Sequence, residues 1–154
     1  MQGLEITSGG LELLSLVRPL REKLYAHHAA LMPCFEHEFD VQKISEYDRL
    51  LADKKRTKSL QVFAAKTEEG RLAGYSLVKV DVENKGELDS LFVEEVFRGE
   101  GLARELSLRA VEWLKQQAVV SLSVRVLPDN QAAKALYRDL GFMPRSLMMR
   151  ICDQ

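Results

Sequence analysis

The 154 residues of this chain predict an α/β fold, with a mixed, mostly antiparallel central sheet flanked by helices. Two observations lead to this expectation. Apolar residues recur every three or four positions in the segments 13–31, 102–117 and 133–140, which is the spacing of one helix face. Between them lie segments rich in β-branched and apolar residues, some joined by tight turns and others separated by a helix. Turns connect antiparallel strands and a helical crossover connects parallel ones, so the sheet is expected to be mixed.

The N-terminal third is expected to hold one strand and two helices. The strand covers Leu4–Thr7, and a long helix follows it. The apolar face of that helix carries Leu13, Val17, Leu20, Leu24, His28 and Leu31. Pro19 is expected either to kink or to divide the helix, and Pro33 to end it. After an acidic loop over 34–41, a shorter helix covers 44–54.

Three consecutive strands are expected in the middle of the chain. Leu60–Ala65 and Leu72–Val82 are joined by a turn at Glu69–Gly70, and a second turn at Asn84–Gly86 leads into Glu87–Val93. Short turns containing glycine are typical of hairpins. The three strands therefore form an antiparallel meander.

The last third alternates helices and strands. A helix from Gly101 to about Gln117 leads to a strand at Ser121–Val126, and Asn130 caps a last helix that stops at Gly141. Phe142–Ile151 is expected to return as a final strand. The predicted order is β-α-α-β-β-β-α-β-α-β. With no internal repeat and no flexible linker, residues 1–154 are expected to form a single domain.

The totals exclude some classes of function. The formal net charge is -1, so no basic field favours nucleic acid as a partner. No run of about 18 apolar residues predicts a membrane span, and the first ten residues lack the pattern of a secretory signal. Cys34 and Cys152 lie far apart without metal-type spacing. A bond between them is open as an alternative, but we expect a reduced, cytoplasmic chain and no metal site.

One loop is suited to bind an anion. Arg98, Gly99, Glu100, Gly101, Leu102 and Ala103 stand between the third meander strand and a helix. Small residues at a helix N-terminus leave the backbone amides bare, and the helix dipole favours a phosphate or pyrophosphate there. The alternative is a turn that uses glycine for its geometry alone. A dinucleotide-binding loop would carry a third glycine where Arg104 stands, and no Walker sequence is present.

A second motif completes a resemblance. The segment Asn130–Phe142 reads Asn-Gln-Ala-Ala-Lys-Ala-Leu-Tyr-Arg-Asp-Leu-Gly-Phe. Together with the loop Arg98–Ala103 and the order of elements, it resembles the GNAT superfamily of acyl-coenzyme A-dependent N-acyltransferases. The resemblance covers about Leu72 to Phe142, and the N-terminal third agrees only in the order of its elements.

The resemblance implies acetyl-coenzyme A as the acyl donor. Its pyrophosphate would rest on the amides of Arg98–Ala103. Its pantetheine arm would lie where the strand containing Leu91–Val93 splays from the strand Leu122–Val126, and an amide near Phe92 would stabilise the oxyanion. Asn130 would serve as a helix cap and as a tether of the cofactor. The residues implied to contact the cofactor are Leu91, Phe92, Val93, Arg98, Gly99, Glu100, Gly101, Leu102, Ala103, Asn130, Ala133 and Tyr137.

The implied general acid is Tyr137, which would protonate the departing thiolate, although its place on an apolar helix face is also that of a core tyrosine. The base is expected to be Glu87, Asp89 or a water molecule. Barring a bulge, Glu87 and Asp89 share a side of their strand with Leu91 and Val93. An ordinary surface position is the alternative for Glu87. The amine would attack the thioester directly, in a ternary complex.

The acceptor is expected to be a primary amine, carried by a small molecule or a peptide. Alternating aromatic and acidic residues at Phe35–Asp40, including Glu36 and Glu38, would suit a cationic amine, although a solvated loop is the alternative. His28 either faces the pocket or lies in the core. Only about a dozen residues follow Gly141-Phe142, so the pocket is expected to be open or completed by a second subunit, as a homodimer that uses Trp113 or the last strand.

Other functions are consistent with the same motifs. One is acetylation of a protein N-terminus or of a lysine side chain. Another is a non-catalytic module that senses coenzyme A, although both the glycine loop and Tyr137 are present. A nucleotide-binding domain would bind adenine nucleotides without requiring pantetheine.

Overall fold

A computed structural model describes residues 3–152. Five strands form one sheet in the order β1-β2-β3-β4-β5. Their bounds are Leu4–Gly9, Thr57–Thr67, Leu72–Asp81, Lys85–Val93 and Ser121–Val124. The first four are antiparallel neighbours, and β5 pairs with β4 in parallel. The expected mixed, mostly antiparallel sheet is therefore confirmed.

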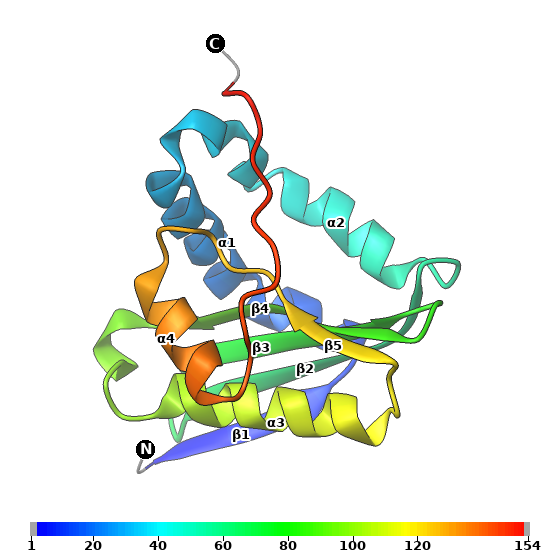
Figure 1. Cartoon of the computed structure of the whole chain (residues 1–154). Coiled ribbons are helices and arrows are strands. Elements are labelled where there is room, and N and C mark those ends of the chain that lie inside the picture. The colour runs from blue at the N-terminus through cyan, green and yellow to red at the C-terminus, as the bar shows by residue number, and fades with distance from the viewer. Residues whose placement is uncertain (1–2, 153–154) are drawn as a thin grey trace.

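Four α-helices flank the sheet (Figure 1). They are α1 (Leu14–Leu31), α2 (Lys43–Ala52), α3 (Leu102–Gln116) and α4 (Gln131–Asp139). Pro19 lies inside α1 without dividing it. Short 3-10 helices are η1 (Leu11–Leu13), η2 (Pro33–Phe39) and η3 (Glu95–Phe97). Among the described residues, no helix is both long and apolar enough to cross a membrane.

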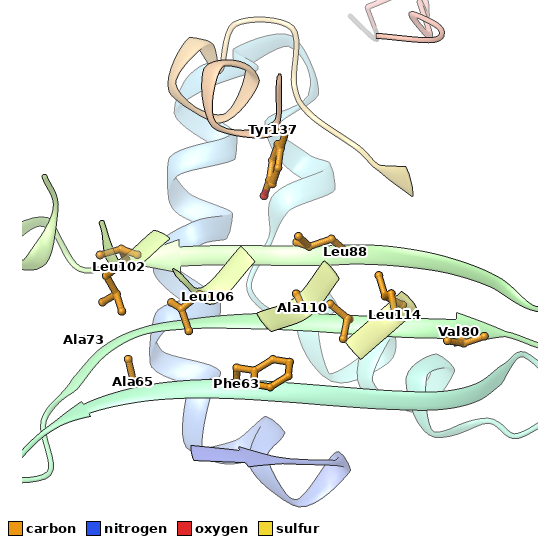
Figure 2. Packing of buried hydrophobic residues seen from close by; sticks show 12 residues of the cluster. Phe63, Ala65, Ala73, Val80, Leu88, Leu102, Leu106, Ala110, Leu114 and Tyr137 are labelled. Carbon is orange, nitrogen blue, oxygen red and sulfur yellow. The ribbon is translucent and has the colours of Figure 1, made fainter. Parts of the chain in front are cut away.

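The two faces of the sheet are covered by different helices. On one face, apolar residues of α1 and α2 pack on Val62, Ala64, Tyr75 and Leu77. On the other face α3 packs its apolar side against β2, β3 and β4 (Figure 2). The residues that α3 buries there are Leu102, Leu106, Ala110 and Leu114. Strands β2 and β3 are thus buried on both faces, which explains their continuous apolar runs.

A bulge at Asp89 changes which residues of β4 share a face. Leu77 lies opposite Ser90 and Val78 lies opposite Leu88, so Asp89 is an extra residue in β4. The expectation that Glu87 and Asp89 share a side with Leu91 and Val93 is therefore wrong. The side-chain alternation shifts by one position at the bulge.

After the bulge, successive side chains of β4 point to opposite faces of the sheet. Leu91 and Val93 belong to the apolar cluster beneath α3. Phe92 packs on the cluster beneath α1, and Asp89 accepts a hydrogen bond from Tyr47 of α2. The bulge therefore turns polar and aromatic groups of β4 toward the α1 and α2 side.

The expected final strand at Phe142–Ile151 is not formed. Residues 143–152, called here the C-terminal segment, carry neither helix nor strand. The far end of this segment is joined to η2, where Cys152 forms a disulfide with Cys34. A strand needs a neighbour with which to exchange backbone hydrogen bonds, and the segment instead leads across β5 toward η2 (Figure 1).

The large apolar side chains of the C-terminal segment remain exposed. They are Met143, Leu147, Met148, Met149 and Ile151, each at least 66% exposed. Their alternation with polar residues is weak, and no element of the described chain covers them. The apolar residues that predicted a buried strand are therefore exposed to solvent.

Candidate active site

A cavity of about 860 Å³ lies in the described part of the structure. Its walls come from α1, the end of η2, β4, the residues after β5, and α4. Of the sequence-predicted residues it gathers Glu87, Leu91, Phe92, Val93, Arg98, Ala103, Asn130, Ala133 and Tyr137. Residues from three distant parts of the chain therefore line one space.

The cavity opens where β4 and β5 part. Their pairing runs from Lys85 with Ser121 to Leu88 with Val124. Beyond the Asp89 bulge, Leu91–Val93 form one wall, and Val124–Leu127 form the opposite wall. No strand of the described chain pairs with β4 beyond Leu88 on this side, so the backbone groups there that are not already hydrogen-bonded can bind an extended ligand as an added strand would.

The glycine loop stands at the N-terminus of α3. Gly101 is the N-cap residue, with φ 88°, and no side chain caps the helix there. Gly99 also has a positive φ of 83°. Both positions favour glycine because an L side chain is strained in this conformation. The first amides of α3 thus remain accessible to an anion.

Part of the loop lies outside the cavity itself. Arg98 and Ala103 line it, whereas Gly99, Glu100, Gly101 and Leu102 do not. Leu102 is buried in the core, and Glu100 borders a smaller depression beside β1 and the β2–β3 turn. A ligand that reached these amides would therefore extend from the cavity over the surface.

Arg98 ties the loop to β4. Its Nε donates a hydrogen bond to the carbonyl oxygen of Val93 at 2.9 Å. Its guanidinium also lies 5.3 Å from the centre of the Phe92 ring. These contacts fix the loop relative to the wall of the cavity, which the sequence motif did not indicate.

Tyr137 enters the cavity from α4. Its ring is 6% exposed and packs edge-on against Phe142, with 5.7 Å between ring centres. The hydroxyl points toward β4 (Figure 2). Burial raises the pKa of this phenol above its usual value. Tyr137 is therefore both a core residue and a protonated group aimed into the cavity.

Asn130 is the N-cap residue of α4. Its side-chain oxygen accepts a hydrogen bond from the amide of Ala133 at 3.1 Å. This is the usual way in which asparagine satisfies a first-turn amide. The cap holds the first turn of α4 beside the cavity, which both residues line.

Two carboxylates of β4, those of Glu87 and Asp89, line the cavity and differ in their hydrogen bonding. Asp89 accepts a hydrogen bond from the Tyr47 hydroxyl, and Lys79 Nζ lies 3.5 Å from its Oδ1. Lys79 also donates to the Tyr47 oxygen at 2.7 Å. Tyr47 and Lys79 were missed by the sequence reasoning, since a tyrosine on α2 and a lysine on β3 carry no local signal of this contact.

Glu87 is the less engaged carboxylate. Burial raises its pKa above the usual value, while Lys79 and Arg125 oppose the shift. Among the described residues no hydrogen bond to its side chain is found, in contrast to Asp89. Glu87 is therefore a cavity carboxylate with a raised pKa and no hydrogen-bond partner in the described structure, whereas Asp89 is bonded to Tyr47 and lies beside Lys79.

The N-terminal elements supply an aromatic and histidine wall. Tyr25, His28, Glu38 and Phe39 line the cavity, and Glu36 does not. His28 lies 5.3 Å from Phe39 between ring centres. Burial, assisted by the neighbouring His27, lowers the pKa of His28 to about 4, so its imidazole is neutral at pH 7.

The two cysteines are joined. Their Cα atoms lie 5.5 Å apart, and the bond links residues separated by 118 positions. The expectation of a reduced chain is therefore wrong for this structure. The pairing could not be predicted from the sequence, because η2 and the C-terminal segment come together only in the tertiary structure.

The comparisons with known proteins agree with this architecture. The chain belongs to the Acetyltransferase (GNAT) family, whose model matches residues 24–142. Among solved structures, a putative acetyl transferase from Pyrococcus furiosus superposes with a TM-score of 0.72 at 22% identity, covering 96% of this chain and 99% of the other. The aminoglycoside N-acetyltransferase AAC(6')-Iy in complex with CoA gives 0.67 at 19% identity, covering 96% and 94%. Similarity at these identities establishes the fold.

Two curated relatives are similar in sequence over part of their length. The mycothiol acetyltransferase of Saccharomonospora viridis is 33% identical over 88 residues, which are 52% of this chain and 29% of that protein. The [ribosomal protein bS18]-alanine N-acetyltransferase of Escherichia coli K12 is 32% identical over 76 residues, 49% of this chain and 51% of the relative. The chain thus spans about half the length, or less, of these relatives.

Proposed function

We propose that this protein is an N-acetyltransferase that moves an acetyl group from acetyl-coenzyme A to a primary amine by direct attack in a ternary complex. One observation carries the proposal: the unpaired wall of β4 and the buried Tyr137 line a single cavity, which Arg98 and Ala103 at the two ends of the glycine loop also border. The proposal covers residues 1–154 as one domain.

The donor half of the cavity suits coenzyme A. The pantetheine arm is proposed to lie against Leu91, Phe92 and Val93, where β4 lacks a partner. The pyrophosphate is proposed to extend onto the amides of Gly99–Ala103 at the start of α3, with Asn130 and Ala133 on the opposite side. The mycothiol and ribosomal-protein relatives are named as acetyltransferases, and a CoA complex is known for a protein of this fold, which supports the assignment.

Tyr137 is proposed as the general acid. Attack of the amine nitrogen on the thioester carbonyl forms a tetrahedral intermediate, whose oxyanion is proposed to accept a hydrogen bond from an amide near Phe92. Collapse breaks the carbon–sulfur bond, the phenol gives its proton to the departing thiolate, and the surplus proton of the attacking nitrogen restores the phenol. The raised pKa keeps this phenol protonated until the thiolate leaves.

Glu87 is proposed as the base. The substrate amine is mostly an ammonium at neutral pH and must lose one proton before it attacks. A carboxylate with a raised pKa accepts this proton better than an ordinary one, directly or through a water molecule. Asp89, bonded to Tyr47 and Lys79, is proposed to shape the site.

The acceptor is proposed to be a cationic amine that enters between α1, η2 and β4. Glu87 supplies negative charge, and Tyr25 and Phe39 supply ring faces for a cation. A protein N-terminus is the second candidate, favoured by the name of the ribosomal-protein relative. A cytoplasmic location and a homodimer remain predictions, the latter supported by the exposed apolar C-terminal segment.

The test is a thiol-release assay with acetyl-coenzyme A and a panel of polyamines, amino acids, aminoglycosides and peptides with free N-termini, next to calorimetric titration of coenzyme A. Turnover with any amine supports the transferase and identifies the acceptor class. Tight cofactor binding without any turnover would favour a sensing module. Absence of cofactor binding would overturn the proposal.

A further inference from the structure

We propose that Cys34 and Cys152 form a redox-controlled clasp on the acceptor side of the cavity, so that reduction of their disulfide loosens η2 and weakens binding of the amine. This inference rests on the proposed function, because it concerns the regulation of that same site. It uses two residues that the transfer reaction does not need.

The clasp joins two segments that are far apart in the sequence. Cys34 is in η2, and Cys152 is near the end of the C-terminal segment. The Cα separation of 5.5 Å is within the range of an ordinary disulfide. The bond therefore fixes the far end of a segment that has no regular secondary structure of its own.

A second contact places the clasp at the cavity wall. Arg150, two residues before Cys152, forms an ion pair with Glu38. Its guanidinium also lies 5.1 Å from the centre of the Phe35 ring. Because Glu38 lines the cavity, the C-terminal segment holds a residue of the acceptor wall without lining the cavity itself.

The other contacts of η2 are noncovalent, and they are made chiefly with α1. No residue of η2 is fully buried, and its helical path is broken at Phe35. Phe39 makes edge-on contacts with Tyr25 and His28, with ring centres 6.4 Å and 5.3 Å apart. The Arg150–Glu38 pair is partly exposed, with side chains 55% and 30% accessible, and such pairs stabilise little. The covalent bond is therefore the strongest link that holds this wall.

The bond is open to reduction. Cys152 is exposed and Cys34 is half-buried. A thiolate of a cellular dithiol would attack one sulfur of the pair, form a mixed disulfide and then close its own disulfide. The clasp gains two electrons and two protons and becomes two thiols, while the dithiol loses the same number. No other reactant is required.

Reduction of the disulfide should weaken binding of the acceptor amine and leave binding of coenzyme A unchanged. The oxidised form holds Glu38 and Phe39 in place before the amine arrives, whereas the reduced form must order them on binding. The glycine loop and the open edge of β4 belong to other elements and keep their contacts. The expected signature is a higher KM for the amine, with unchanged affinity for coenzyme A.

The experiment compares the oxidised and reduced full-length protein with the variants Cys152→Ser and Cys34→Ser. Non-reducing peptide mapping should find 34 linked to 152. Hydrogen exchange over residues 33–39 should speed up on reduction and in both variants, while exchange in α3 stays constant and shows that the fold persists. Reduction should raise the amine KM about fivefold in the wild type and leave Cys152→Ser unaffected.

Each result decides the inference. Two free thiols after oxidation, or unchanged exchange over 33–39 on reduction, would overturn it. An amine KM that does not respond to reductant would overturn it as well. Exchange and peptide mapping require no turnover, so a protein that acetylates no amine refutes the proposed function while these two measurements still report on the clasp.

Discussion

The hydroxyl of Tyr47 on α2 donates a hydrogen bond to the carboxylate of Asp89, the bulged residue of β4. Lys79 on β3 contacts both groups, at 2.7 Å from the Tyr47 oxygen and 3.5 Å from Asp89 Oδ1. A strand, a second strand and a helix are thus joined by one polar cluster. Glu87, two residues earlier on β4, lies outside this cluster and is the carboxylate that we propose as the base.

Glu87→Gln should lower kcat/KM for the amine by about 100-fold, because a carboxamide cannot accept the proton. The raised pKa of Glu87 predicts the direction of the pH profile. Activity falls as the pH drops through this pKa and the carboxylate is protonated, so the acid limb should lie above the usual glutamate value. A profile of kcat/KM against pH checks this.

Asp89→Asn is the matched control for Glu87→Gln. It changes charge by the same amount on the same strand but at a residue that is already bonded. We expect a smaller loss of activity and an acid limb at the wild-type position. If Asp89→Asn abolished the acid limb and Glu87→Gln preserved it, the base would have been assigned to the wrong carboxylate.

Tyr137→Phe should reduce kcat by about 100-fold or more and leave the dissociation constant of coenzyme A nearly unchanged. The ring, which packs on Phe142, is retained, so the melting temperature should change little. Pre-steady-state thiol release and calorimetry check the two parts. Tyr75→Phe, which removes a buried hydroxyl bonded to Ser90, serves as the control and should keep most of the turnover. Full activity of Tyr137→Phe would remove the assigned acid.

Gly101→Asp should abolish binding of coenzyme A, because it places a negative charge and a strained left-handed residue at the start of α3. Gly70→Asp is a close match, since Gly70 has φ 86° and an equally open surrounding but lies in the β2–β3 turn. Both variants should lose similar stability, of about 1 to 2 kcal/mol. Only Gly101→Asp should lose the cofactor in calorimetry, and equal affinities would contradict a phosphate site here.

His28 should make the protein less stable in mild acid. Its pKa is lowered to about 4 in the folded protein. The unfolded chain therefore binds a proton at His28 below about pH 6.5, whereas the folded protein binds it only near pH 4. The free energy of unfolding should therefore fall between pH 6.5 and pH 4, by roughly 1 to 2 kcal/mol once solvent screening is included.

His28→Phe tests this origin of the acid sensitivity. The variant keeps a ring against Phe39 and removes the titrating group, so urea unfolding at several pH values should show a flatter profile. His27→Gln, at the exposed neighbouring position, should retain most of the wild-type slope. An unchanged slope in His28→Phe would assign the acid sensitivity to other groups.

The local features of the site could be predicted from the sequence. The glycines that begin α3, the asparagine that caps α4 and the spacing that places Tyr137 on its apolar side all act within one or two turns of chain. The meander β2–β3–β4 also follows from short turns, and the departure of β4 from β5 was an expectation of the resemblance. The strand predicted to reach Val126 ends at Val124, and the predicted final strand at Phe142–Ile151 is not formed, because the extent of a strand depends on its neighbour and not on the segment itself.

The contacts between distant segments could not be predicted in the same way. No pattern in the sequence indicates that Asp89 is bulged, because a bulge arises from matching two strands and has no length signal of its own. The meeting of Tyr47 with Asp89 follows from that bulge. Glu38 lines the cavity and Glu36 does not, and the sequence could not distinguish the two, because the backbone path of η2 decides which of them faces the cavity.

The sequence by itself determined the periodicity, the turns, the helix caps and the glycine loop at the start of α3, because these depend on interactions among residues a few positions apart. Only the tertiary structure decided that β4 is bulged, that Cys34 meets Cys152 and that the last ten described residues leave the sheet. Each of these outcomes depends on contacts between segments that are far apart in the sequence. The free energy of such contacts comes from packing in the folded protein, which the residues of one segment do not determine.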